Sequence, residues 1–333
     1  MPKQSRPLVV CALSTAALFP LSSFAQTTLQ PIKTSLEEES FQTELVMHAL
    51  KELGYELNAP KTMTYAEAYQ YVSANSGAFF AAAWLPTHQE LLSSGDKDGQ
   101  VYVGGSYVPQ SAQGYQIDKA TADKHKLSSM DQLKDPAIAK LFDHDGNGKA
   151  ELIGCQPDWV CSKVIDHQIK RYGLSDTVEQ IQGDYNALMD SVIDKQRAGK
   201  PVLYYTWTPH WISYELQPEK ESIWLEVPFS ALPENKDTTL PHGKNYGFEM
   251  NSQRIVANKE LALAHPDVHR LFEIIQLKPN EVSAENHLLH KAEKGQHNTV
   301  AYMQAWIIKN RALFDSWLEE AKRAKQVETG SDN

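Results

Sequence analysis

The sequence predicts an α/β fold with two domains. Short apolar runs bounded by Gly or Pro alternate with stretches of helical periodicity, which is typical of sheets covered by helices. The chain has 333 residues, of which 41% are hydrophobic and 22% charged, enough for two ordinary globular domains. No long linker rich in Pro, Gly or Ser separates them, which indicates that the chain crosses between the domains more than once.

The first helix is predicted to begin at a capping box and to end at Gly54. Ser35 and Glu38 fit the box, in which each side chain satisfies a free backbone N–H of the first turn. Apolar residues recur at helical spacing over 41–53. Gly54 follows where such a helix would end.

Two buried strands are predicted to end at tryptophan residues. Ala78–Trp84 and Pro201–Trp207 are short apolar runs, the pattern of strands that are buried on both faces. Thr208 and Pro209 follow the second run and are typical of a helix N-terminus. In open α/β sheets ligands bind beyond the carboxyl ends of strands, which is where both tryptophans lie.

The rest of the chain continues the alternation. A helix is predicted over 162–172, with Gly173 after it, and the last third, over 262–326, is predicted to be mostly helical. Further strands are predicted at 101–108, 114–118, 151–154, 223–227 and 254–258.

The first 25 residues are predicted to be a secretory signal peptide. Lys3 and Arg6 precede an apolar run of 14 residues over 8–21, and Ser23 and Ala25 are small residues at the positions that a signal peptidase reads. The run is shorter than the roughly 20 residues of a membrane-spanning helix. We expect cleavage after Ala25 and a mature protein that is exported and soluble.

The charge excludes one class of partner. Lys and Arg number 32 against 42 Asp and Glu, and the net charge of −10 becomes −12 when Lys3 and Arg6 leave with the signal peptide. Phosphate binding needs clustered positive charge, and no run of Lys or Arg occurs. We therefore expect no nucleic acid as partner.

Export also affects how the cysteines are interpreted. Cys11 lies in the predicted signal peptide, so Cys155 and Cys161 remain. In an oxidising compartment this pair favours a disulfide over a metal site. The closed loop would be small, so the bond should stabilise the fold by only about 2 kcal/mol. It would mainly shape the loop that contains Trp159.

One segment matches the first part of a calcium-binding loop. Oxygen ligands are expected there at positions 1, 3, 5 and 9, with Gly at position 6. The bidentate acid expected at position 12 is missing, because Gly154 stands there. A structural calcium ion and a plain polar turn both fit this segment. The four oxygen-bearing side chains are Asp143, Asp145, Asn147 and Glu151.

Common catalytic motifs are absent from the sequence. It contains no Gly-x-Ser-x-Gly elbow, His-Glu-x-x-His zinc helix, Walker loop or dinucleotide fingerprint. The pairs His265/His269 and His287/His290 have helical ligand spacing, but scattered solvated histidines explain them better. The absence of these motifs is only weak evidence against a common enzyme.

Three tryptophans are the main functional signal. Trp84, Trp159 and Trp207 lie at strand ends or in a loop beside Pro, whereas core aromatics usually lie within an element. Each alone could cap the core, but together they favour a shared aromatic site. Aromatic faces attract a quaternary ammonium group by ~0.5–2 kcal/mol per contact. Neutral aromatics also suit a cation that must be released.

Five longer motifs follow one another along the chain: Trp84-x-Pro-x-His88, Gly154-Cys155-x-Pro157-x-Trp159-x-Cys161, Tyr204-Tyr-Thr-Trp207-Thr-Pro-x-Trp211, Val227-Pro-Phe-Ser-Ala-Leu-Pro233 and Asn245-Tyr-Gly-Phe248. In content and order they resemble the periplasmic glycine betaine/proline betaine-binding proteins of ProU-type ABC importers. The resemblance implies a hinged, two-domain substrate-binding protein of the Venus-flytrap type, located in the periplasm. Each domain would be a mixed or parallel sheet flanked by helices.

The resemblance also implies the ligand site. Trp84, Trp159 and Trp207 would form a cage around the trimethylammonium or dimethylpyrrolidinium group. The disulfide between Cys155 and Cys161 is also the family's pattern.

The other end of the ligand would be held by hydrogen-bond donors. The resemblance places the ligand carboxylate at the His88 side chain and at the backbone N–H groups of Val160 and Cys161. Free N–H groups at the start of a helix favour an anion. A zwitterion held in this way needs no catalytic group, so the resemblance implies a protein that is not an enzyme and requires no cofactor.

Domain boundaries also follow from the resemblance. Residues 26–111 and 248–333 would form domain I, and residues 112–247 would form domain II. Trp84 and His88 would come from domain I and the other ligand residues from domain II, with the ligand in the cleft. Closure would then be a population shift favoured by contacts that exist only when both domains engage the ligand.

The predicted function is capture of glycine betaine or proline betaine for osmoprotection. Delivery would be to an ABC importer permease with its ATPase, and we expect a monomer. Three alternatives stay open. The protein could bind another quaternary amine, such as choline or carnitine, although choline would leave His88 unused. It could be an exported hydrolase or lyase that uses His88, or a sensor of osmolyte level.

Overall fold

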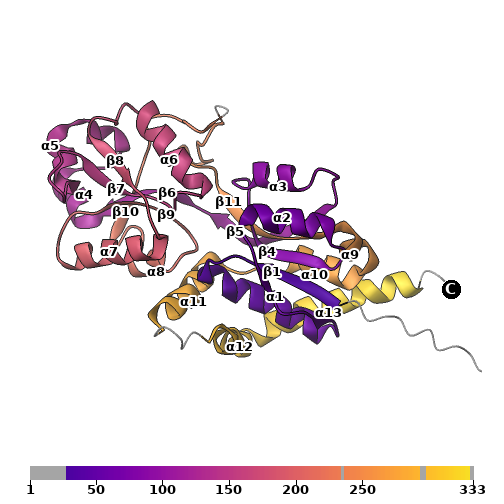
Figure 1. The fold of residues 1–333 in the computed structure, drawn as a ribbon. Helices are drawn as coiled ribbons and strands as arrows, with labels where there is room; N and C mark the ends of the chain where they lie inside the picture. Colours follow the sequence, from indigo (N-terminus) through magenta and orange to yellow (C-terminus); the bar gives the residue numbers. More distant parts are fainter. Residues whose placement is uncertain (1–27, 234–235, 293–297, 331–333) are drawn as a thin grey trace, which may run out of the picture.

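The computed structural model describes residues 28–233, 236–292 and 298–330, and it shows two mixed sheets flanked by helices (Figure 1). The predicted α/β fold with two domains is therefore confirmed. The predicted signal peptide, including its cleavage site at Ala25, lies outside the described residues. In the part of the chain that the structure describes, every helix is too short or too polar to cross a membrane.

The first sheet has six strands and draws on both ends of the chain. Its order is β2-β1-β4-β11-β5, and β3 pairs with β1. Strand β1 runs parallel to β2, β3 and β4, whereas β11 is antiparallel to β4 and β5. We call this sheet and its helices domain I. Its strands are β1 (Thr28–Lys33), β2 (Glu56–Leu57), β3 (Lys61–Thr62), β4 (Ala78–Leu85), β5 (Val101–Ser111) and β11 (Asn251–Asn258).

The helices of domain I come before β5 and after β11. The early helices are η1 (Glu37–Glu39), α1 (Ser40–Glu52), α2 (Tyr65–Ala74) and α3 (Gln89–Gly95). The late helices are α9 (Lys259–Ala264), α10 (Pro266–Ile274), α11 (Pro279–Lys291), α12 (Thr299–Lys309) and α13 (Arg311–Gly330), so the predicted helical last third is confirmed. Helix α11 contacts α8 of the other domain as well as η1 and α1 (Figure 1).

The second sheet has five strands in the order β10-β6-β9-β7-β8. Strand β6 is antiparallel to β9 and β10, and β7 is parallel to β8 and β9. We call this sheet and its helices domain II. Its strands are β6 (Gln113–Asp118), β7 (Ala150–Ile153), β8 (Val178–Ile181), β9 (Leu203–Trp207) and β10 (Ser222–Leu225). Its helices are α4 (Lys119–His125), η2 (Met130–Lys134), α5 (Pro136–Ala139), η3 (Lys140–Phe142), α6 (Val160–Arg171), α7 (Tyr185–Arg197) and α8 (Ile212–Glu215).

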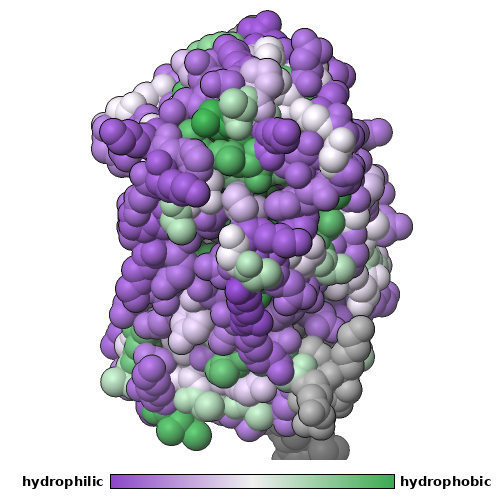
Figure 2. All heavy atoms as spheres, turned by 90° about the vertical axis from the view of Figure 1, so that its left-hand side faces the viewer, coloured by the Kyte–Doolittle hydropathy of each residue, from purple (hydrophilic) through white to green (hydrophobic). Residues whose placement is uncertain are grey.

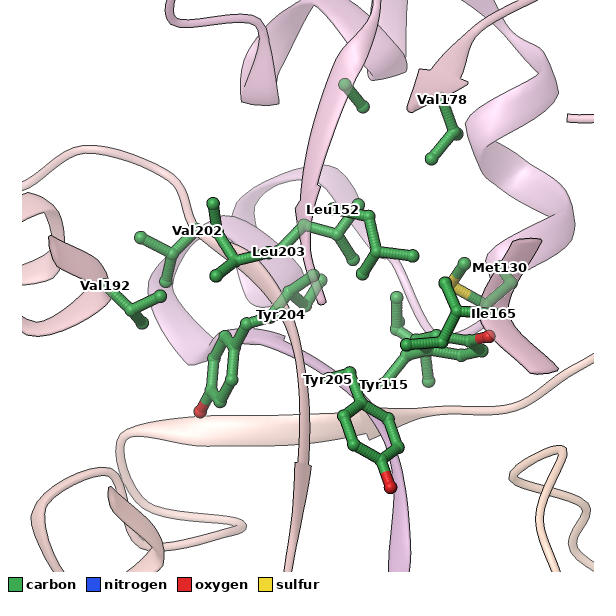
Figure 3. Packing of buried hydrophobic residues seen from close by; sticks show 14 of the residues in the cluster. Tyr115, Met130, Leu152, Ile165, Val178, Val192, Val202, Leu203, Tyr204 and Tyr205 are labelled. Carbon is green, nitrogen blue, oxygen red and sulfur yellow. The ribbon is translucent and has the colours of Figure 1, made fainter. Parts of the chain in front are cut away.

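The core of domain II lies on both faces of its sheet. Figure 3 shows Leu152 of β7 beside Leu203 of β9, which are register partners, with Ile165 of α6 and Val192 of α7 packed nearby. All four side chains are at most 1% exposed. The outer end of this domain is mostly hydrophilic, with apolar side chains in separate small groups (Figure 2).

The chain passes from the first sheet to the second within one residue, because β5 ends at Ser111 and β6 begins at Gln113. The intervening Ala112 is tied to the end of β9: its carbonyl accepts from the N–H of Thr208 at 2.8 Å, and its N–H donates to Thr208 Oγ1 at 3.2 Å. The segment that follows Trp207 is therefore anchored to the crossing between the domains.

Thr208 and Pro209 do not begin a helix, so this prediction was wrong. The bond between them is cis, and α8 begins only at Ile212, with Trp211 at its N-cap. The hydrogen bonds of Thr208 to the crossing segment explain the difference, because they hold the chain against β6 where the helix was expected.

The predicted capping box was also wrong. Leu36 and Glu39 are the N-cap residues of η1 and α1, and neither makes a side-chain cap. Glu38 is 6% exposed and faces the other domain, with Oε1 3.7 Å from His210 Nε2. The contact of Glu38 with His210 of domain II therefore replaces the predicted capping contact with the backbone near Ser35.

The predicted strands are confirmed, and the helix expected from residue 162 begins two residues earlier, at Val160.

Candidate functional site

The domain I side of the candidate site begins with Trp84, the penultimate residue of β4. The strand is buried on both faces and delivers the indole to the end of the sheet, where it is 8% exposed. Its Nε1 donates to Glu39 Oε1 at 2.7 Å. The same oxygen accepts from the Tyr65 hydroxyl at 2.7 Å, so one carboxylate holds two aromatic side chains.

His88 follows in a tight turn, in which its N–H donates to the carbonyl of Trp84 at 2.7 Å. The imidazole Nδ1 lies 3.4 Å from the backbone N of Trp84 and 3.1 Å from the Tyr69 hydroxyl. A backbone N–H can only donate, so Nδ1 is an acceptor and the neutral ring has its proton on Nε2. Burial lowers the pKa of His88 to about 3, so the ring stays neutral near pH 7.

The Nε2–H of His88 is the group that is left for a ligand. Within the described residues it makes no hydrogen bond, although the ring is only 6% exposed. The Tyr65 ring lies 4.3 Å from the imidazole, between centroids, and limits its movement. A neutral N–H donor held in this way suits a carboxylate.

The domain II side begins with a loop that a disulfide closes. Cys155 and Cys161 form this disulfide, which confirms the predicted bond, and their Cα atoms are 6.2 Å apart. The loop runs from the end of β7 to the first turn of α6 and contains Trp159, the N-cap residue of that helix. Val160 and Cys161 are the first two helical residues, so their N–H groups have no intrahelical acceptor. All three are partly exposed.

Trp207, the last residue of β9, packs against Trp159. The two ring centroids are 5.8 Å apart, with an interplanar angle of 69°. Tyr185 of α7 contacts both rings, at 4.6 Å from Trp207 and 5.7 Å from Trp159. The Tyr185 hydroxyl donates to the carbonyl of Tyr205 at 3.0 Å, which fixes this third ring. The result is an aromatic wall built from three elements of domain II.

The two sides meet in one hydrophobic cluster. Trp84 and Trp207 both belong to the buried cluster of domain II, and Trp159, Val160 and Cys161 pack against it. Among the described residues Trp84 makes no ring contact with the other two tryptophans. The structure thus places Trp84 of domain I against the core of domain II, which Trp159 and Trp207 also contact. The roles of these residues toward a ligand stay predictions.

The predicted calcium loop makes its own hydrogen bonds. Asp143 accepts from the N–H groups of Gly146 and Gly148, at 2.7 and 3.0 Å. Glu151 pairs with Lys195 Nζ at 2.7 Å, outside the loop. Among the described residues no group of three or more His, Cys, Asp or Glu side chains is arranged to hold a metal ion. The calcium site, with Asp145 and Asn147 as its other ligands, stays a prediction.

A surface hollow lies apart from this site. It has a volume of about 420 Å³ and lies at the outer edge of the domain I sheet, lined by Gln30, Asn58, Lys61 and Asn75 among others. None of the predicted ligand residues lines it.

Sequence reasoning missed several residues around the site. Glu38 fits a capping box by its spacing from Ser35, and nothing in the local sequence indicates that Glu38 and Glu39 are buried. The sequence also does not indicate a role in the site for three tyrosines, because each lies in an ordinary helical pattern: Tyr65, Tyr69 and Tyr185. One signal could have indicated two of them. Tyr65 and Tyr185 each follow an N-cap residue directly, Thr64 and Asp184, so each is the first residue of its helix.

Comparisons with known proteins agree with this architecture. A family model described as the substrate-binding domain of the ABC-type glycine betaine transport system (OpuAC) matches residues 27–309. The glycine betaine/proline betaine-binding periplasmic protein of Escherichia coli K12 is 42% identical over 329 residues, covering 96% of this chain and 100% of the relative. The glycine betaine-binding periplasmic protein OusX of Dickeya dadantii is 43% identical over 300 residues, covering 89% and 90%.

Solved structures of low sequence identity share the fold. Lactococcal OpuAC, closed and in complex with glycine betaine, superposes with a TM-score of 0.65 at 15% identity, covering 87% of this chain and 99% of that one. A choline-binding protein of an ABC transporter, in complex with choline, gives 0.66 at 14% identity, covering 90% and 97%.

Proposed function

The chain belongs to the family of substrate-binding domains of ABC-type glycine betaine transport systems, and from this premise we propose that it captures glycine betaine or proline betaine and delivers it to an ABC importer. Relatives that match it over nearly their whole length are named for these two ligands and for the periplasm. We place this chain in the periplasm as well, after cleavage of the signal peptide at Ala25.

The observation that supports the proposal most is the pairing of an aromatic wall with a neutral donor. Trp159 and Trp207 offer π faces from domain II, and Trp84 joins them from domain I. These faces can bind a quaternary ammonium, which is unable to donate hydrogen bonds. His88 offers an Nε2–H, and the start of α6 offers two N–H groups, to the carboxylate of the same ligand.

The mechanism is reversible capture without a covalent step. Because the ligand residues come from both domains, a bound betaine would make its full set of contacts only when the domains are closed. The closed, loaded form would be recognised by the permease with its ATPase. We propose that the protein acts as a monomer, as an osmoprotectant carrier, with no enzymatic activity.

Calorimetric titration of the mature protein tests the proposal. Saturable binding of glycine betaine and proline betaine is expected, with choline weaker because it has no carboxylate for His88. NMR of the ligand after incubation should show it unchanged, which separates a binder from a hydrolase or lyase. Absence of binding of either betaine would contradict the proposed function, and stronger binding of choline would assign the protein to another quaternary amine.

A further inference from the structure

Glu39 is a buried carboxylate that contacts the candidate site. It is 2% exposed, and its Oε1 accepts from Trp84 Nε1 and from the Tyr65 hydroxyl, each at 2.7 Å. Its Oε2 accepts from Thr34 Oγ1 at 2.6 Å. Two of its three donors therefore belong to the site, because Trp84 is a predicted cage residue and Tyr65 packs on the His88 ring.

No cationic side chain within the described ranges balances this carboxylate. Among the described residues, no Lys, Arg or His nitrogen lies within ion-pair distance of Glu39. Its neighbour Glu38 is also acidic and buried. A buried charge without a counter-charge is costly, and burial raises the pKa of Glu39 to about 7. The position therefore favours the arrival of a positive charge from outside the chain.

We propose that Glu39 is a positioning and specificity residue for the ligand cation: it fixes the Trp84 indole and provides the negative charge that a quaternary ammonium balances on binding. The inference rests on the proposed function. The carboxylate meets the indole at its N–H edge, so Glu39 itself covers neither face of the ring. The charge at the edge adds to the negative potential of the face, which is the part of the ring that attracts cations.

Binding should consequently be coupled to loss of a proton from Glu39. A bound cation stabilises the ionised carboxylate, so the pKa of Glu39 is lower in the complex than in the free protein. Below about pH 7 the free protein must release a proton to bind, and the affinity therefore falls as the pH falls. Between pH 8 and pH 6 a single group of this pKa can weaken binding by up to about tenfold.

Few other groups facing Glu39 titrate in this range. From α2, Tyr65 and Tyr69 face it, and burial raises the pKa of both far above 8. His88 lies beyond Tyr65 and titrates near pH 3. Glu38, whose pKa burial also raises to about 7, is the one neighbour that could contribute, and it faces His210 of domain II.

The test compares two matched substitutions with the unchanged protein. Glu39→Gln removes the charge, while the amide oxygen can still accept from Trp84 and Tyr65 and the amide nitrogen can donate to Thr34. Glu281→Gln is the control, because Glu281 also accepts from an indole, Trp306 Nε1 at 3.2 Å, but in helices α11 and α12. Glu38→Gln separates the contribution of the neighbouring acid.

Glycine betaine affinity is measured by calorimetry at pH 6 and pH 8, and proton release is measured at pH 6 in phosphate and in bis-Tris, two buffers that differ in their enthalpy of ionisation. The unchanged protein, the control and Glu38→Gln should bind more weakly at pH 6 and release a proton on binding, seen as a buffer-dependent enthalpy. Glu39→Gln should bind roughly tenfold more weakly at pH 8 and show neither effect. The expected size corresponds to the loss of one attraction between opposite charges near the protein surface.

Three results would overturn the inference. One is an affinity of the unchanged protein that is the same at pH 6 and pH 8 without proton release. Another is a Glu39→Gln variant with weaker binding but an undiminished pH dependence, because Glu39 would then be only structural. The third is unchanged affinity in that variant. Failure of the unchanged protein to bind glycine betaine at either pH would instead contradict the proposed function.

Discussion

The two halves of the candidate site are held in place by different interactions. In domain I, Trp84 and His88 are fixed by hydrogen bonds to buried side chains, and each is less than 9% exposed. In domain II, Trp159 and Trp207 are fixed by ring contacts with one another and with Tyr185, and Trp159 lies on a disulfide-bonded loop.

This difference has a consequence for ligand recognition. Hydrogen bonds are directional, so the domain I half can specify where a carboxylate lies. Ring contacts depend less on direction, so the domain II half can accept either a trimethylammonium or a dimethylpyrrolidinium group. Losing an aromatic side chain should therefore weaken binding of every quaternary amine, whereas losing His88 should weaken only the binding of carboxylates.

The largest effect is expected at the aromatic wall. Trp159→Ala should weaken binding of glycine betaine and of choline alike by roughly 30-fold, which corresponds to the upper end of a cation–π contact, ~2 kcal/mol. The melting temperature should change little, because Trp159 is partly exposed. Trp224→Ala is the control, since this partly exposed tryptophan of β10 pairs with Tyr246 instead. Unchanged affinity after loss of Trp159 would contradict the assigned cage.

A smaller and more selective effect is expected at His88. His88→Ala removes the Nε2–H donor, and a hydrogen bond to a charged group contributes ~1.5–3 kcal/mol, so glycine betaine should bind at least about tenfold more weakly. Choline affinity should stay the same. Tyr69→Phe, which keeps the donor and removes only a neighbour, should weaken glycine betaine binding less. Equal losses for both ligands would show that His88 does not read the carboxylate.

The disulfide should affect stability more than binding. Replacing Cys155 and Cys161 together by Ser opens a short loop and should lower the free energy of unfolding by about 2 kcal/mol, measured by urea denaturation. The N–H of residue 161 remains in the variant, so affinity should fall by only a few-fold. A complete loss of binding in a folded variant would mean that the bond itself positions the aromatic wall.

A change of pH should leave the charge of His88 in the native protein unaltered. Burial lowers its pKa to about 3, so the native ring should show no protonation in NMR spectra between pH 8 and pH 5. Since the unfolded chain takes up the proton near pH 6.5, acid should gradually favour unfolding through this group. A native His88 signal that titrates near pH 6 would show that the ring is not enclosed as described.

Local patterns predicted the strands and the disulfide of the site better than its buried hydrogen bonds. The strands that carry Trp84 and Trp207 at or next to their last residue were predictable, because a short apolar run bounded by Gly or Pro is itself the signal of a buried strand. The disulfide was predictable from spacing and export. The positions of the three tryptophans favoured a shared aromatic site for a cation, and the resemblance added the betaine ligand and the contacts to its carboxylate.

The hydrogen-bonded half depends on contacts between distant segments. Glu39 meets Trp84 across 45 positions of the chain, and Glu38 meets His210 of the other domain. No local pattern distinguishes these buried acids from a solvated helix start, so a capping box was predicted there. The helix predicted to begin at Thr208 was wrong for the same reason, because the hydrogen-bond partner of Thr208 is Ala112, which lies between β5 and β6.

A crystal structure of the mature protein with glycine betaine tests the central claim most directly. The ammonium group is predicted to lie among Trp84, Trp159 and Trp207. The carboxylate is predicted to accept from His88 Nε2 and from the N–H groups at the start of α6. A ligand that contacts one domain only, or a carboxylate turned toward the tryptophans, would contradict the account.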